Sequence, residues 1–304
     1  MDTASPAAVK PPARGALDIF LLVALATLWG SSYGFIKVGV ETIPPVTLIL
    51  ARTAIAGLLL FLALLLMGLR LPMGRRAWTS FAVQACLNSV LPFTAIAWAE
   101  TRVDAGLATI LNSTSPIFVF LLALILNLPG ERTLAKFTGV ALGFLGIVLV
   151  VGADALKGLT LDLVAQLAIV AATVCYAGAA VFGRRFGEYH PLVPAAGSMI
   201  AGAALLLPAS LVLDRPWTLA PSRDSLLALA GLSLLSTTLA FALYFRLLRT
   251  LGSVGITAQA YLRVPIGVAI GVVFLGETLP ASAWAGMACV VAGVAAMTLR
   301  GSPR

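Results

Sequence analysis

The sequence predicts an all-α polytopic membrane protein with ten transmembrane helices, arranged as two inverted five-helix repeats around a central cavity. Composition is the first observation behind this class. Hydrophobic residues make up 60% of the 304 residues and charged residues 11%, whereas soluble domains carry about 25% charged residues. The apolar runs are long and lack the alternation of barrel strands, so they indicate membrane helices. An internal repeat and the charge of the loops are the other two observations.

The chain contains two copies of one unit. Residues 106–116 read GLATILNSTSP and residues 255–265 read GITAQAYLRVP, so that glycine and proline recur at the same spacing. Other residues pair in both halves: Lys37 with Arg184, Pro44 with Pro191, Thr101 with Thr250, Glu131 with Glu277, Gly139 with Gly286, and Gly146 with Gly293. Such a period predicts two repeats, at residues 17–153 and 154–300.

The elements follow in order from a flexible N-terminal tail. Residues 1–16 are rich in proline and alanine and too polar to cross a membrane. A signal peptide is the alternative, but the first apolar run, residues 17–38, exceeds the roughly 7–15 residues of a signal core. The predicted spans cover residues 17–37, 46–67, 78–99, 104–127, 134–152, 161–183, 192–213, 225–246, 254–275 and 281–299.

Loop charge predicts the orientation. Of the 20 Lys and Arg residues, 13 lie on the N-terminal side of the membrane, five lie on the other side, and Arg52 and Arg263 lie within spans. By the positive-inside rule, both termini are cytoplasmic. Because each repeat has an odd number of spans, the second is inverted, which is typical of transporters whose site lies between the halves near the midplane. The net charge of +8 is spread over short loops, so nucleic acid is not expected as a partner.

Motifs for catalysis are not convincing. Residues 30–34 read GSSYG and fit the nucleophile-elbow pattern around Ser32, but the only histidine, His190, lies in a loop on the opposite side. An apolar helix also lacks the strand–turn–helix setting of that motif. We interpret GSSYG as a helix-packing face of small residues. No aspartate lies near the middle of a span and the cysteines are isolated, so we expect no enzyme, metal or cofactor.

Polar groups at membrane depth mark the candidate site. Pro116 and Pro265 lack an N–H, which frees the carbonyl groups of Asn112 and Tyr261 four residues earlier. Interhelical hydrogen bonding is one explanation for the polar side chains nearby, and a substrate cavity is the other. The candidate substrate-binding residues are Gln84, Asn88, Asn112, Gln259, Tyr261 and Arg263, together with Trp29, Tyr33 and Tyr176, which either line a pocket or pack.

Arg263 is the most informative of these residues. An arginine near the centre of a helix costs at least roughly 2.5–3.5 kcal/mol on insertion scales, so something must compensate. In a structural role, the guanidinium group would bond to the Asn112 carbonyl or to the side chain of Asn88 or Gln84. In a functional role, it would face a cavity and bind the carboxylate of a substrate. Arg52 lies near the outer boundary, where its side chain could reach the membrane surface.

The motifs resemble those of the EamA-type drug/metabolite transporter superfamily. They are WGSSYGFIK in the first span, PPVTLILART in the second, and NSTSPIF leading to GERT, with its echo of RVPIGV leading to GETL. The resemblance covers nearly the whole chain. It implies helices around a central cavity with the fifth and tenth spans at the periphery, and export of amino acids or other metabolites. Arg263 departs from the small or neutral residue that is usual before the second proline.

We therefore expect a secondary transporter of the cytoplasmic membrane that exports small amphipathic metabolites, with amino acids, some aromatic, as the leading substrates. The alternatives are a carrier of anionic solutes such as nucleotide sugars or organic acids, and a non-transporting scaffold or an enzyme acting on lipid-linked substrates. Since Glu41, Glu100, Glu131 and Glu277 lie at span ends or in loops, strong proton coupling is not expected unless Glu100 enters the cavity. A monomer and a homodimer are both compatible with the sequence.

Overall fold

The computed structural model describes residues 16–126, 134–155, 160–244, 246–247, 250 and 259–299. These residues form helices and no strand, which confirms the predicted all-α class. Eight helical segments are long and apolar enough to cross a membrane, and the shorter apolar helices Leu262–Phe274 and Ala281–Ala296 occupy the positions of the ninth and tenth predicted spans. Every predicted span therefore contains a helix.

Each repeat is a series of helices with short irregular helical pieces. The first contains α1 (Ala16–Gly39), α2 (Pro45–Leu66), α3 (Arg75–Ala85), the π-helix η1 (Cys86–Val90), α4 (Leu91–Ala99), α5 (Ala105–Asn112), α6 (Ser115–Ile125) and α7 (Leu134–Ala155). The second contains α8 (Leu161–Phe182), the 3₁₀ helix η2 (Gly183–Phe186), α9 (Leu192–Leu213), the 3₁₀ helix η3 (Pro216–Thr218), α10 (Arg223–Ser233), the π-helix η4 (Leu234–Leu239), α12 (Gln259–Phe274) and α13 (Ala281–Leu299). The side chains of Thr160 and Ser222 cap α8 and α10, as their short hydroxyl groups favour.

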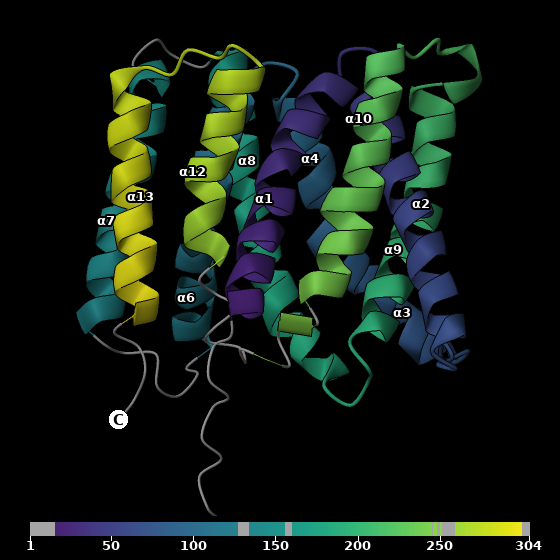
Figure 1. Ribbon diagram of the computed structural model, residues 1–304. Helices are drawn as coiled ribbons and strands as arrows, with labels where there is room; N and C mark the ends of the chain where they lie inside the picture. The colour runs from purple at the N-terminus through teal and green to yellow at the C-terminus, as the bar shows by residue number, and fades with distance from the viewer. Residues whose placement is uncertain are drawn as a thin grey trace, which may run out of the picture.

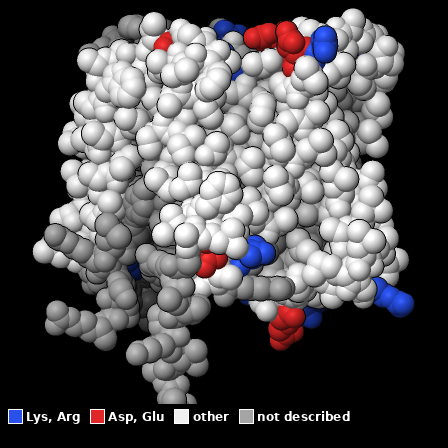
Figure 2. All heavy atoms as spheres, viewed as in Figure 1, with Lys and Arg blue, Asp and Glu red and all other residues white. Residues whose placement is uncertain are grey.

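The helices stand side by side in one bundle (Figure 1). α1 begins and α13 ends at the lower end of this view, while α8 runs downward, opposite to α1, so the second repeat is inverted. Charged side chains lie along the upper and lower edges of the visible face, with an uncharged band between them (Figure 2). This band is the surface that lipid tails would cover.

Glycines join α7 to α13 at one side of the bundle (Figure 1). A Cβ atom added to Gly146 would lie 2.8 Å from the carbonyl oxygen of Gly286, and one added to Gly286 would lie 2.9 Å from that of Gly146. Gly293 approaches the Gly139 carbonyl and the Gly143 nitrogen in the same way. Such close backbones require glycine. These glycines therefore serve internal packing, and α7 and α13 are peripheral, as the resemblance implied.

The fourth predicted span, residues 104–127, is interrupted near Pro116. α5 ends at Asn112 and α6 begins at Ser115, because Pro116 cannot donate to the preceding turn. The freed carbonyl of Asn112 accepts a hydrogen bond from Ser115 Oγ at 2.8 Å. Pro265, by contrast, lies inside α12. Of the two repeat-equivalent prolines, Pro116 therefore follows a break in the helix, whereas Pro265 lies within a continuous one.

Two other spans contain a π-helical segment. In η4, the hydroxyl groups of Thr237 and Thr238 donate to the carbonyl groups of Leu232 and Ser233, five residues earlier, at 2.8 and 2.9 Å. In the third span, η1 directly precedes α4, whose second residue is Pro92. Segments of this kind are frequent at functional sites.

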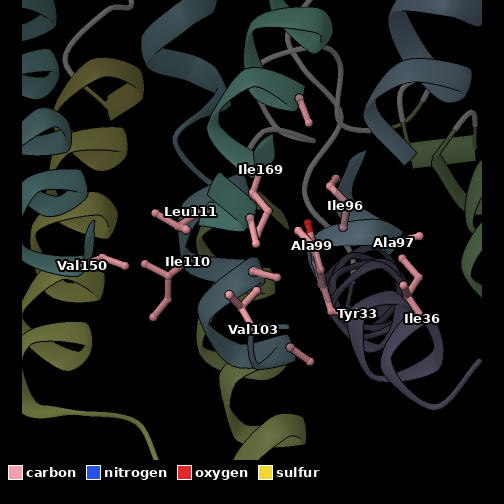
Figure 3. Close-up of a cluster of buried hydrophobic side chains, with 14 of the residues drawn as sticks. Tyr33, Ile36, Ile96, Ala97, Ala99, Val103, Ile110, Leu111, Val150 and Ile169 are labelled. Atoms are coloured by element: carbon pink, nitrogen blue, oxygen red, sulfur yellow. The ribbon is translucent and has the colours of Figure 1, made fainter. Parts of the chain in front are cut away.

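A buried apolar core holds the helices of both repeats together. Figure 3 shows side chains of α1, the α4 region, α5, α7 and α8 converging: Tyr33, Ile36, Ile96, Ala97, Ala99, Val103, Ile110, Leu111, Val150 and Ile169. Tyr33 also lines the cavity described below. The wall of that cavity therefore rests on close-packed side chains, which hold its polar groups in place.

Candidate functional site

A cavity of about 420 Å³ lies among helices of both repeats. We call it the central cavity. Seven of the nine predicted site residues line it: Trp29, Tyr33, Asn88, Asn112, Tyr176, Gln259 and Arg263. The lining also includes Ser32, Ile36, Arg52, Phe93, Ile96, Ser115, Ser236, Phe241 and Tyr244.

The other two predicted residues are placed differently. Gln84 lines a neighbouring cavity and not the central one. Tyr261 lies in α12, but its side chain is outside the described residues. Most of the predicted residues therefore lie around one cavity, and Gln84 lies in the neighbouring one.

Arg263 brings a guanidinium group to the central cavity. Its Nε is buried, and no described residue accepts a hydrogen bond from it. The proposed structural acceptor, the Asn112 carbonyl, is instead bonded to Ser115 Oγ. Since no residue in the described part of the chain accepts from it, the Nε–H group can donate a hydrogen bond to a ligand.

Two amide oxygens in the same cavity are also buried without a donor among the described residues. They are Oδ1 of Asn112 and Oε1 of Gln259. The Asn112 amide nitrogen donates to the Tyr33 hydroxyl, so the orientation of the amide group is held by this hydrogen bond. A buried polar atom without a partner is unfavourable unless a ligand or water supplies one.

Arg52 is a second cation in the central cavity and corrects the expectation that its side chain reaches the membrane surface. It is 5% exposed. Nε donates to Thr237 Oγ1 at 3.0 Å, and Cζ lies 3.9 Å from the centre of the Phe93 ring. These contacts hold the arginine against the cavity wall. An arginine within an apolar run is only a weak sequence signal for such a position.

Aromatic rings form much of the remaining wall. Trp29 packs against Phe241 and Tyr244, with ring centroids 6.5 and 5.6 Å apart, and Phe93 lies 6.4 Å from Tyr176. Phe93, Phe241 and Tyr244 were not predicted. Their spans are apolar on all sides, so periodicity does not distinguish a cavity face from a lipid face.

The GSSYG segment packs α1 against α12, as predicted. A Cβ atom added to Gly30 would lie 3.1 Å from the carbonyl oxygen of Arg263, and one added to Gly34 would lie 3.1 Å from Ile270 Cγ2. The Ser32 hydroxyl donates to the Trp29 carbonyl at 2.7 Å. The small residues therefore bring α1 close to the arginine of the site.

A second cavity of about 380 Å³, which we call the vestibule, shares Asn88, Phe241 and Tyr244 with the central cavity. It is also lined by Gln84 and by residues of η2 and the turn that follows, at the lower end in Figure 1. Because they share these residues, the two cavities are neighbours, with the vestibule on the side of the lower end.

Polar contacts close the upper end. Lys37 Nζ donates to the carbonyl groups of Glu100 and Val103 at 2.9 and 2.8 Å. The Glu277 carboxylate of the second repeat accepts the N–H groups of Ala105 and Gly106 at 2.7 and 2.9 Å. These contacts satisfy carbonyl groups in the turn after α4 and the first N–H groups of α5.

A further set of hydrogen bonds links α2 of the first repeat to the end of α9 in the second. The Asp214 carboxylate accepts from the Thr47 N–H and hydroxyl at 2.9 and 2.8 Å, and the Thr47 and Ser210 hydroxyls lie 2.7 Å apart. Together with the Glu277 contacts, these hydrogen bonds hold both repeats together at the upper end.

Glu100 is fully buried at this closed end, and neither carboxylate oxygen has a donor among the described residues. Burial raises the pKa of its carboxyl group well above the usual range, an effect opposed by the nearby Lys37 ammonium and increased by Glu277. It does not line the central cavity. Protonation of Glu100 therefore changes the charge at the closed end and not the charge of the central cavity lining.

One family matches both halves of the chain. It is the EamA-like transporter family, which matches residues 16–152 and again residues 163–299. The chain belongs to this family. This EamA-like protein is therefore a membrane transporter, and the resemblance of its motifs to the drug/metabolite transporter superfamily is confirmed.

Relatives of this transporter match along nearly its whole length. It is 28% identical over 287 residues to the "Uncharacterized inner membrane transporter YedA" of Escherichia coli (strain K12), covering 94% of this chain and 92% of the relative. It is 29% identical over 287 residues to the "Probable terminal-alkyne amino-acid exporter" of Streptantibioticus cattleyicolor, with 91% of each chain covered. The "Probable amino-acid metabolite efflux pump" of Salmonella typhimurium is 26% identical over 290 residues, covering 91% of this chain and 93% of the pump.

A solved structure has the same fold. The chain described as "Crystal structure of protein" superposes on this transporter with a TM-score of 0.65 at 21% sequence identity, covering 93% of this chain and 97% of the other. The likeness supports the arrangement of helices.

Proposed function

We propose that this transporter exports small amphipathic metabolites, chiefly α-amino acids and among them aromatic ones, across the cytoplasmic (inner) membrane by alternating access. The observation that carries the proposal is the set of unpaired polar atoms around the central cavity. Arg263 Nε has no acceptor, and Asn112 Oδ1 and Gln259 Oε1 have no donor, among the described residues. One donor and two acceptors match the two ends of an α-amino acid.

The central cavity contains a suitable partner for the carboxylate, the ammonium group and the side chain of an amino acid. The carboxylate would bind Arg263, whose planar guanidinium suits it. The ammonium group would donate to the amide oxygens of Asn112 and Gln259. An aromatic or aliphatic side chain would lie against Trp29 and Tyr176, which line the same cavity. Two relatives are named as amino-acid exporters or efflux pumps, which agrees with this assignment.

The closed upper end and the vestibule support alternating access. Lys37, Glu277 and Asp214 hold the upper ends of helices from both repeats. The central cavity adjoins the vestibule at the lower end. Inverted repeats expose a shared site to one side at a time, and the position of the vestibule supports access to the site from the lower end.

A carrier of anionic solutes, such as organic acids or nucleotide sugars, is the second candidate. Two guanidinium groups, of Arg52 and Arg263, line the central cavity, and its described lining contains no carboxylate. A solute with a net negative charge would be attracted to such a cavity. Arg52, however, is already bonded to Thr237, which leaves it less free than Arg263.

Counterflow in liposomes distinguishes these candidates. Purified protein would be reconstituted with a high internal concentration of one solute, and uptake of labelled phenylalanine, leucine, citrate or a nucleotide sugar would be measured. We expect exchange with the amino acids. Exchange with the anionic solutes alone would favour the second candidate, and no exchange with any solute would support a non-transporting role.

We also propose that both termini are cytoplasmic, so that the lower end faces the cytoplasm. Thirteen of the 20 Lys and Arg residues belong to that side. A reporter that is active only in the cytoplasm, fused after Arg304, should be active. If a reporter active only outside the cytoplasm works at this position, the orientation is reversed.

A further inference from the structure

A basic depression lies at the lower end, separate from the central cavity. It has a volume of about 530 Å³ and is lined by Arg75, Arg76, Thr79, Ser80 and Arg185. Its residues come from α3 of the first repeat and η2 of the second. We call it the lower basic site. It plays no part in the proposed transport mechanism.

The lining of the lower basic site contains three arginines and no carboxylate. Arg75 and Arg76 are the first two residues of α3, where the helix dipole is positive, and the first turn of α3 contains no acidic residue. The salt bridges of the described residues include none with these arginines or with Arg185. Like charges brought together in this way are unfavourable without an anion between them.

An aromatic cluster fixes the two sides of the site relative to each other. Trp78 packs on Phe81 with ring centroids 5.8 Å apart, and Phe81 stacks on Phe186 of η2 at 5.6 Å. Phe186 packs on Phe182, and the Arg185 guanidinium lies 4.0 Å from the centre of the Phe182 ring. The arginines are therefore presented from a packed base.

The surroundings of the site indicate an amphipathic ligand. α3 begins a membrane span at Arg75. Just before it along the chain, Met73 is 88% exposed, and Leu66, at the end of α2, is 90% exposed. A phosphate group at the arginines would thus have apolar surface next to it, at the depth where headgroups meet acyl chains.

We propose that the lower basic site binds the phosphate of an anionic phospholipid headgroup, which bridges α3 and η2. Guanidinium groups bind phosphate oxygens through paired N–H donors, and basic pockets beside membrane helices recognise such headgroups. Phe186 lines the vestibule, as do Arg184 and Gly187 on either side of Arg185 and Phe186. A lipid bound here would stabilise one wall of the vestibule.

Native mass spectrometry of the purified full-length transporter tests the proposal. The protein would be titrated with phosphatidylglycerol, with cardiolipin and with phosphatidylcholine of the same acyl chains. The triple variant Arg75→Gln/Arg76→Gln/Arg185→Gln should bind the two anionic lipids at least about tenfold more weakly, because it loses three charge-assisted contacts. Phosphatidylcholine binding should be weak and unchanged.

The control variant Arg70→Gln/Lys136→Gln/Arg246→Gln removes the same charge from other sites and should bind anionic lipid as the wild type does. If it loses as much affinity as the first variant, the attraction is general and the proposal is wrong. Millimolar inorganic phosphate is a further arm: if it binds the site and lipid does not compete, the ligand is a free anion and not a lipid. Should the triple variant not purify, Arg185→Gln alone should show a smaller loss, and normal lipid binding by it would contradict the proposal.

Discussion

The Lys37 ammonium group is bonded to the main chain of Glu100 and not to its carboxylate: Nζ lies 2.9 Å from the carbonyl oxygen. The carboxylate itself is buried without a donor among the described residues. Its ionisable neighbours are Lys37, Glu277 and Arg52, and burial is the largest cause of its raised pKa. The closed upper end therefore favours the protonated form of Glu100.

This relationship predicts that acid favours closure of the upper end. If opening hydrates Glu100, its pKa returns towards about 4.3, so the closed form binds the proton more tightly. Closure is then increasingly favoured as the pH falls through the raised pKa, and this advantage is lost above it. In Glu100→Gln, closure should be nearly independent of pH, because the amide remains neutral.

Maleimide labelling measures this equilibrium in a variant without Cys86, Cys175 and Cys289. A cysteine placed at the buried Ala99 should react more slowly at low pH with Glu100 present, and slowly at all pH values with Glu100→Gln. A cysteine at the exposed Thr101 is the control for the intrinsic pH dependence of the reagent. Equal pH dependence in both backgrounds, after this correction, would show that Glu100 is not the titrating group.

A second prediction concerns Glu277, whose carboxylate binds the Ala105 and Gly106 N–H groups. Glu277→Gln loses the negative charge at the start of α5 and one of the two acceptors, so we expect a loss of roughly 1–3 kcal/mol in stability. Hydrogen exchange of residues 105–108 should accelerate. Glu41→Gln, which changes an exposed carboxylate at the same end, should leave both measurements unchanged. Unaltered protection in Glu277→Gln would exclude this anchoring role.

The glycine contacts of α7 and α13 yield a third prediction. Gly146→Ala places a methyl group 2.8 Å from the Gly286 carbonyl oxygen, so the two helices must separate, at a cost of roughly 1–3 kcal/mol. Gly178→Ala in α8 is the matched control, because the added Cβ would come no closer than 3.5 Å to a neighbouring residue, at Leu87 Cδ2, and alanine favours a helix. Thermal unfolding in detergent should show a lower Tm for the first variant only. Equal Tm values would mean that α7 and α13 do not pack this closely.

The sequence was sufficient for the bundle because hydropathy and the glycine–proline spacing act locally. Residues such as Arg263 and Asn112 were recognisable because polar groups at membrane depth are costly and need partners. Other parts of the site depend on which face of a helix points inward. Arg52 meets Thr237 across 185 positions of the chain, and Phe241 lies in a span without an apolar stripe. Such contacts arise from packing, which hydropathy does not encode.

The final prediction separates the two roles considered for Arg263. Because Nε has no acceptor among the described residues and an arginine at this depth is costly, Arg263→Gln should fold and insert normally. If the guanidinium binds the substrate carboxylate, its loss removes a charge-assisted contact worth about 1.5–3 kcal/mol, and the apparent KM for phenylalanine in counterflow should rise roughly 10- to 100-fold. Arg263→Lys should be intermediate, since it keeps the charge and loses the planar fork. Arg223→Gln, at an exposed position outside the cavity lining, should transport as the wild type does. Normal KM in Arg263→Gln would exclude the carboxylate role, and a variant that fails to fold would instead support a structural one.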